Sequence, residues 1–171
     1  MEDFVYTAVL ISAYPICLVT AGVLDLFTYS IPNRICLFLI VSFLIVAIFV
    51  GASASLVLSN LFAGCLLLGI GFAMFSQGWL GGGDAKLIAS TALWIGLDHL
   101  FAFLLWTTIL GGVLSVVVLV YRRTLPPIWL LRQPWAMRLH DPKEGIPYGV
   151  AIAGAGLIVY PETIWMTGIA G

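Results

Sequence analysis

Residues 87–121 read LIASTALWIGLDHLFAFLLWTTILGGVLSVVVLVY, and the number of helices in the chain depends on how this segment is divided. As a single helix it would measure roughly 50 Å, far more than the apolar core of a membrane, which is about 30 Å thick. Two short helices joined by a turn at residues 96–99 fit better. The sequence therefore predicts a break near Gly96, with an apolar helix on each side of it.

The composition excludes an ordinary soluble domain. Of the 171 residues, 62% are hydrophobic and 9% are charged, and the mean hydropathy is +1.14. Soluble globular chains carry about 25% charged residues, so a surface this apolar requires the lipid bilayer as its partner. No basic face interleaved with aromatic residues is present, which argues against a nucleic-acid partner. The length suits one domain, residues 1–171.

The charges support a division into about six membrane-crossing helices. Four further apolar segments, residues 4–24, 35–51, 56–75 and 146–166, flank the divided one. With six crossings, every lysine and arginine falls on one side, which the positive-inside rule places in the cytoplasm, and both termini lie outside. The expected fold is an all-α, polytopic membrane helical bundle. The basic residues are Arg34, Lys86, Arg122, Arg123, Arg132, Arg138 and Lys143.

Two aspartates stand at the boundary of these spans on the basic side. Asp25 follows the first apolar run, and Asp84 precedes the fourth. An acid at membrane depth is costly and so is a candidate functional residue, although at the boundary each could also be a helix-end residue, Asp84 for example an N-terminal cap. Two such carboxyl groups held close together would share a proton, as the catalytic acids of an aspartic protease do. Residue types alone leave the catalytic pair and two unrelated helix-end acids both open.

The segments around the two acids favour a built site. Three glycines, residues 81–83, precede Asp84, and so flexible a helix start makes sense if the backbone must approach something closely, such as an extended peptide. Pro32 and Asn33 follow Asp25, where proline fixes a turn and asparagine can satisfy free backbone groups. Each acid is therefore expected beside a rigid loop.

Other catalytic and structural roles fit the inventory less well. His99 and His140 fall on opposite sides and lack partners at the spacing of a zinc site or a serine-protease triad. The cysteines show no CxxC spacing and are expected to be small apolar side chains. A non-enzymatic assembly or transport protein would explain the helices, but a transporter should carry polar groups at mid-span. Asn60 is expected to make a hydrogen bond between helices instead.

Three short segments resemble the prepilin peptidase family, the GxGD-type membrane aspartyl proteases. Residues 81–87 (GGGDAKL) are similar to its G-x-G-D-x-K-L motif. Residues 25–26 (DL) with 31–33 (IPN) resemble the block around its first catalytic aspartate, and residues 146–152 (IPYGVAI) resemble the start of its last helix. The motifs occur in the family's order on a six-helix pattern, which makes the resemblance specific.

The resemblance implies an aspartic endopeptidase that cuts the leader peptide from pilin precursors at the cytoplasmic face of the bacterial inner membrane. Asp25 and Asp84 would be the catalytic pair, and no metal or organic cofactor is implied. Gly81 and Gly83 would shape the loop, with Pro32 and Asn33 in the opposing one. Lys86 would lie beside the site or serve only as a boundary cation, and Pro147 and Gly149 are interpreted as helix-start geometry.

The chain departs from the longer prepilin peptidases, which carry paired CxxC motifs linked to methylation of the trimmed pilin. It resembles instead the short peptidases of tight-adherence (Flp-type) pilus systems, and no methyltransferase activity is expected. Archaeal preflagellin peptidases share the same motif and remain an alternative. The connection at residues 122–145 is interpreted as an interfacial loop or as a substrate-docking surface.

Overall fold

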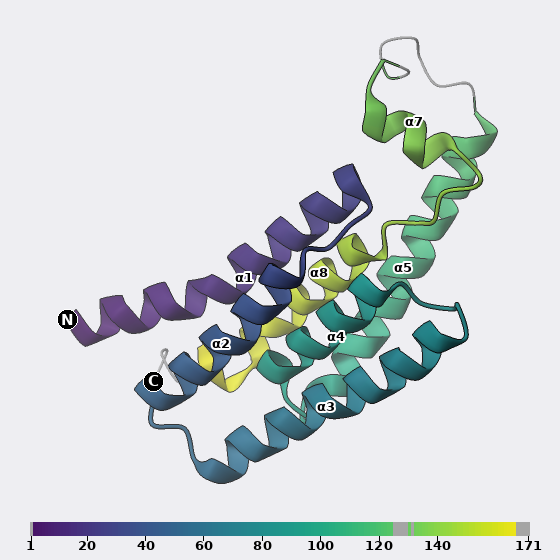
Figure 1. The fold of residues 1–171 in the computed structure, drawn as a ribbon. Coiled ribbons are helices and arrows are strands. Elements are labelled where there is room, and N and C mark those ends of the chain that lie inside the picture. Colours follow the sequence, from purple (N-terminus) through teal and green to yellow (C-terminus); the bar gives the residue numbers. More distant parts are fainter. Residues whose placement is uncertain (1, 125–129, 131, 167–171) are drawn as a thin grey trace.

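The computed structural model describes residues 2–124, 130 and 132–166, with side chains from Ser12 onward. Pro126, Pro127 and Trp129 of the predicted interfacial loop lie outside the described residues. Within the described part every regular element is a helix, which confirms the all-α prediction (Figure 1). The elements are α1 Glu2–Thr28, α2 Asn33–Phe49, α3 Ala54–Ser76, α4 Gly82–Ile95, α5 Leu100–Arg123, α7 Pro134–His140, α8 Tyr148–Val159 and the 3-10 turn η1 Tyr160–Glu162.

The predicted break between α4 and α5 is confirmed. Gly96 ends α4 with a φ of 73°, a backbone conformation that glycine adopts without strain. Asn60 of α3 lies against this turn, and its Nδ2 donates a hydrogen bond to the carbonyl of Leu93 at 2.8 Å. The interhelical role predicted for Asn60 is therefore confirmed, and it fixes α3 against the end of α4.

Several helices differ in length from the spans predicted. α3 and α5 are long and apolar enough to cross a membrane, whereas α2 and the 12–28 portion of α1 form shorter apolar helices. α4 has 14 residues and α8 has 12. The single last span predicted at residues 146–166 is wrong, because α8 ends at Val159 and the chain continues as a 3-10 turn containing Pro161. Proline has no N–H to donate along a helix, which accounts for the change.

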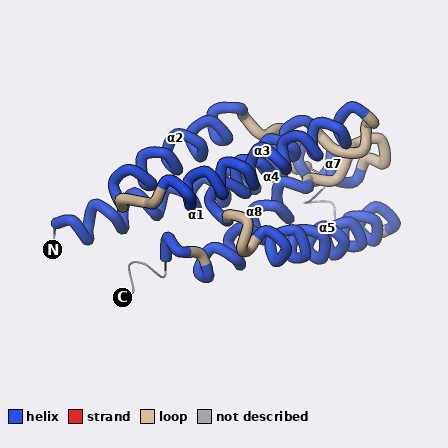
Figure 2. The backbone as a smooth tube through the Cα atoms, turned by 90° about the horizontal axis from the view of Figure 1, so that it is seen from below, coloured by secondary structure: helices blue, strands red, loops and turns tan. Residues whose placement is uncertain are grey.

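α4 and α8 occupy the middle of the bundle, with α3 and α2 packed on α4 and with α1 and α5 packed on α8 (Figures 1 and 2). Small residues allow these close approaches. A Cβ at Gly71 of α3 would lie 3.0 Å from Ala85 Cβ, and one at Gly22 of α1 would lie 3.2 Å from Ala153 Cβ. Close packing through small residues is typical of helices in membranes.

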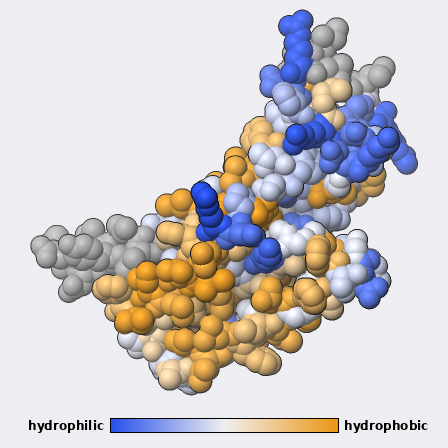
Figure 3. Space-filling model, viewed as in Figure 1, coloured by the Kyte–Doolittle hydropathy of each residue, from blue (hydrophilic) through white to orange (hydrophobic). Residues whose placement is uncertain are grey.

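The polar parts of the chain gather at one end of this bundle. The last turns of α1 and α5 meet the first turns of α2, α4 and α8 there, and α7 lies above them (Figure 1). Every lysine and arginine belongs to these turns or to the connection between α5 and α8. Figure 3 shows hydrophilic surface around α7 and hydrophobic surface over the lower part of the bundle. This arrangement is consistent with a helical membrane bundle that has one strongly basic end.

Candidate functional site

Asp25 and Asp84 line one cavity of about 250 Å³ at the basic end of the bundle. Asp25 comes from the last turn of α1, and Asp84 is the third residue of α4. Three of the other residues singled out from the sequence, Gly81, Gly83 and Asn33, also line this acid cavity. Pro32 is the N-cap residue of α2 next to it, and Lys86 follows Asp84 by two residues along α4. The fold thus brings together two acids that are far apart in the sequence.

The carboxyl group of Asp25 is held by the start of α8. Asp25 is 6% exposed, and the backbone N–H of Gly149 donates a hydrogen bond of 2.7 Å to its Oδ2. Gly149 stands in the first turn of α8, where free N–H groups and the helix dipole favour a negative charge. A Cβ at residue 149 would lie 2.7 Å from the same oxygen, so only glycine fits. Burial raises the pKa of Asp25, and the hydrogen bond from Gly149 opposes this by favouring the ionised form.

Asp84 lies in a different environment. It stands ahead of the apolar part of α4, outside the segments expected to cross the membrane. Burial and, second to it, the charge of Asp25 raise the pKa of Asp84 to about 7, while a hydrogen bond from the backbone of Gly81 opposes both. This bond from the residue that precedes the helix resembles half of a capping box, so the helix-end role considered for Asp84 is also present. Its carboxyl group therefore keeps its proton up to about pH 7.

The glycine run before Asp84 packs against the chain itself. A Cβ at Gly83 would lie 3.3 Å from Ile31 Cβ, and one at Gly82 would lie 3.3 Å from the ring of Phe75. A Cβ at Gly81 would lie 2.9 Å from Asp84 Oδ2. The close approach predicted from the glycines therefore exists, but its partners are the loop before α2, the end of α3 and the acid itself.

Lys86 connects the two motifs from its position beside the cavity. Its Nζ donates a hydrogen bond of 3.0 Å to Oδ1 of Asn33, which joins α4 to the first turn of α2. Lys86 is exposed and does not line the acid cavity. Asn33 does line the acid cavity. Lys86 therefore contacts the site through Asn33, whose side-chain amide it orients.

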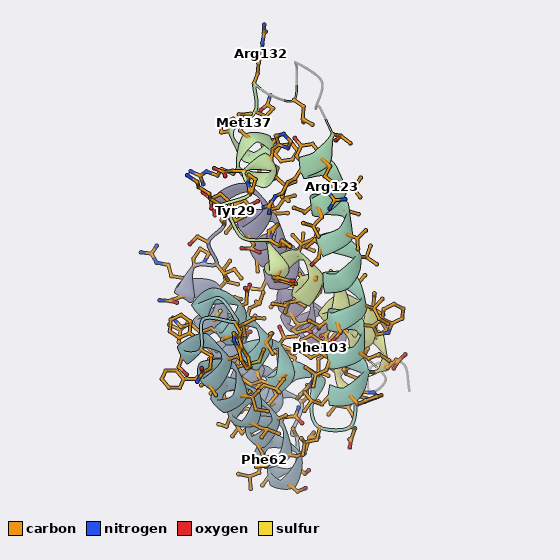
Figure 4. All side chains as sticks on the ribbon, turned by 90° about the vertical axis from the view of Figure 1, so that its right-hand side faces the viewer. Tyr29, Phe62, Phe103, Arg123, Arg132 and Met137 are labelled. Carbon is orange, nitrogen blue, oxygen red and sulfur yellow. The ribbon has the colours of Figure 1, made fainter. Side chains whose placement is uncertain are left out.

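Tyr29 also lines the acid cavity, and nothing in the sequence had pointed to it. It is the one described non-glycine residue with a positive φ, 54°, and its N–H closes the end of α1 by bonding to the Asp25 carbonyl at 2.8 Å. Such strain costs about 1–3 kcal/mol and clusters at functional sites. Burial raises the pKa of Tyr29, with Arg122 opposing, so its hydroxyl stays protonated. Figure 4 shows Tyr29 directly below α7.

The connection from α5 to α8 is anchored over this end of the bundle. Arg122 donates hydrogen bonds of 2.9 Å from Nε to the carbonyl of Leu139 and from Nη2 to the carbonyls of Glu144 and Gly145. Trp135 of α7 packs edge-on against Phe27 of α1. These contacts hold the segment that leads into α8, and they thereby hold the Gly149 N–H against Asp25.

No group of three or more histidine, cysteine, aspartate or glutamate side chains arranged to hold a metal occurs among the described residues. His99 lies 3.9 Å from Glu162 near the far end of the bundle, and the three cysteines are free thiols.

Comparison with known protein families identifies the family of this chain. Residues 12–116 match the sequence model of the type IV leader peptidase family, and this match includes both Asp25 and Asp84. The chain belongs to the type IV leader peptidase family. Neither the curated proteins nor the solved structures contain a match. Membership supports a leader-peptidase-like protease over a non-enzymatic assembly or transport protein.

The part of the chain that matches the family ends within α5. It therefore leaves out α7 and α8, together with the Gly149 N–H that bonds to Asp25. A single sequence offered no signal for that contact, because 124 residues separate its partners. Sequence reasoning had assigned Gly149 only a role in starting the helix, and the structure adds a role in the site.

Proposed function

We propose that this leader peptidase is an aspartic endopeptidase that cleaves pilin precursors, with Asp25 and Asp84 as its catalytic pair. The observation that carries the proposal is that both carboxyl groups line one cavity at the basic end of the bundle. By the positive-inside rule this end faces the cytoplasm, on the inner membrane of a bacterium. The basic leader of a pilin precursor would reach the acids from that side, with the apolar helix still in the bilayer.

The different surroundings of the two acids support separate roles. Asp25, which accepts the Gly149 N–H, is the ionised member and takes a proton from the attacking water. Asp84 is the protonated member and donates its hydrogen to the oxygen of the scissile carbonyl. The hydroxide adds to the carbonyl carbon, and collapse of the tetrahedral intermediate then breaks the C–N bond. The leaving amine takes up the proton that Asp25 acquired, a hydroxyl of the intermediate returns its proton to Asp84 as the carbonyl re-forms, and the pair regains its starting state.

Cleavage can be tested with the purified protein in lipid vesicles together with a pilin precursor. We expect a shortened product whose N-terminus, read by peptide sequencing, lies at the junction between the basic leader and the apolar helix. A precursor with the leader removed serves as the size standard. If the precursor stays intact, or if it is cut inside the apolar helix, the proposed function is wrong.

The pH profile provides a separate prediction. Because Asp84 must carry its proton, kcat/KM should fall as the pH rises through about 7, the value to which its pKa is raised, by about tenfold per pH unit beyond it. Circular dichroism at each pH controls for unfolding. A rate that stays constant from pH 6 to 9 would contradict the role given to Asp84.

A further inference from the structure

A second cavity opens on the side of the bundle between α2, α3 and α4. Its volume is about 450 Å³, and its walls are almost entirely apolar. Several of its side chains face outward, with Leu37 61% and Leu68 47% exposed, so the cavity is open toward the surroundings of the bundle. We name it the apolar groove; its main walls are Leu37, Ile40, Cys65, Leu68, Ala89 and Leu93.

The apolar groove adjoins the acid cavity through one shared lining residue. Asn33 lines both, and the hydrogen bond from Lys86 to Asn33 stands at the junction between them. A polypeptide held at Asp25 and Asp84 therefore has an adjacent apolar path along α2 and α4. A third cavity of about 390 Å³ between α1 and α2, lined by Cys17 and Phe38 among others, shares no residue with the acid cavity.

We propose that the apolar groove binds the first turns of the precursor's apolar helix, on the carboxyl side of the scissile bond. This inference rests on the proposed function. An apolar helix laid in a groove buries its side chains against the walls, and in water this burial of apolar surface is favourable. In a bilayer the gain is smaller, because the helix leaves lipid rather than water, and the groove contributes to binding of the segment that follows the scissile bond.

The positive charge of Lys86, at the junction of the groove and the acid cavity, favours entry of one segment of the precursor into the groove over the other. Among the described residues, Lys86 is the only lysine or arginine that lines the groove or the acid cavity. A basic leader would meet a like charge there and would have to leave water for an apolar wall, which is unfavourable. The leader is therefore directed away from the groove, toward the polar end, while the apolar segment passes Asn33 into the groove.

Two native cysteines make the proposal testable by disulfide trapping. Cys65 is exposed in the wall of the apolar groove, whereas Cys17 lines the unconnected cavity between α1 and α2. In an Asp84→Asn background, which keeps the precursor intact, one variant retains only Cys65 (C17S with C36S) and its matched control retains only Cys17 (C36S with C65S). Each is mixed in vesicles with precursors that carry one cysteine and is oxidised with copper phenanthroline.

We expect disulfides between Cys65 and precursor positions within about the first eight residues after the scissile bond, recurring every three to four residues as on a helix. The Cys17 variant should give at least tenfold less product at the same positions. Trapping that favours Cys17, trapping of leader positions by Cys65, or no disulfide with Cys65 would each overturn the proposal.

Filling the groove gives a kinetic test. Cys65→Trp should raise KM about tenfold and leave kcat within about twofold, because an apolar contact of this kind acts equally on bound substrate and transition state. Cys17→Trp is the matched control and should change neither constant, and membrane levels of both variants report folding. If the unmodified protein cleaves the precursor but Cys65→Trp leaves KM unchanged, as expected of a groove filled by lipid, only the groove assignment fails. If the unmodified protein cleaves nothing, the proposed function itself fails.

Discussion

Asp84→Asn and Asp25→Asn should each lower kcat for precursor cleavage by about a thousandfold or more. Proton transfer by a positioned acid or base contributes on the order of 10²–10⁴ in rate, and the proposed cycle uses one of each. Asparagine keeps the shape of both side chains. Its oxygen can still accept the Gly149 N–H at residue 25 and the Gly81 backbone bond at residue 84. The loss is therefore expected without loss of folding.

The measurement is single-turnover cleavage of a precursor in vesicles, with protein levels compared by immunoblot. Asp98→Asn is the matched control, because Asp98 is an exposed aspartate in the turn between α4 and α5, outside the acid cavity. It should retain the full rate. A rate within tenfold of the unmodified protein for either Asp25→Asn or Asp84→Asn would refute the catalytic pair, even if the other variant were inactive.

Gly149→Ala should lower kcat/KM by about a hundredfold. The new methyl group would lie 2.7 Å from Asp25 Oδ2 and 2.9 Å from its Cβ, so either the carboxyl group or the start of α8 must move. A displacement of about 1 Å in a catalytic group costs roughly this factor. The movement also lengthens the hydrogen bond that stabilises the ionised Asp25, so the acidic limb of the kcat/KM profile should shift to higher pH.

The pH profile separates this effect from general damage to α8. Gly154→Ala is the matched control on the same helix, because its methyl group would meet only the flexible end of Leu110, at 3.0 Å. It should keep both the rate and the profile. Should Gly149→Ala cleave at the normal rate, or lose rate with an unchanged acidic limb, the stabilisation of Asp25 by α8 would not hold.

The helical arrangement could be predicted closely because it depends on local composition. The apolar runs, the glycine at residue 96 and the one-sided placement of lysine and arginine each act over a few residues, and together they give the helix order and the basic end. The end of the last helix was predicted too late in the chain. The apolar run continues past Pro161, and hydropathy does not reflect that proline lacks a backbone N–H donor.

The candidate site was predicted in part. Asp25, Asp84, Gly81, Gly83 and Asn33 were singled out from the sequence, and the fold brings them to one cavity. Tyr29 was not predicted as a site residue. Its distinguishing feature is a positive φ, which the residue type tyrosine does not indicate. The apolar groove could not be predicted either. Its walls come from three helices, and the sequence of each helix is that of an ordinary apolar span.

The sequence by itself determined an all-helical, strongly apolar chain, as expected of a membrane bundle, with two aspartates in motifs that resemble those of a leader peptidase. Those properties follow from hydropathy, from the placement of charges and from short motifs, all of which are local features of the sequence. Only the tertiary structure decided that the two acids differ. The start of α8 packs on the end of α1 and directs the Gly149 N–H at Asp25, whereas Asp84 is buried beside that charge. Such a difference arises from distances between segments far apart in the chain, which no local pattern encodes.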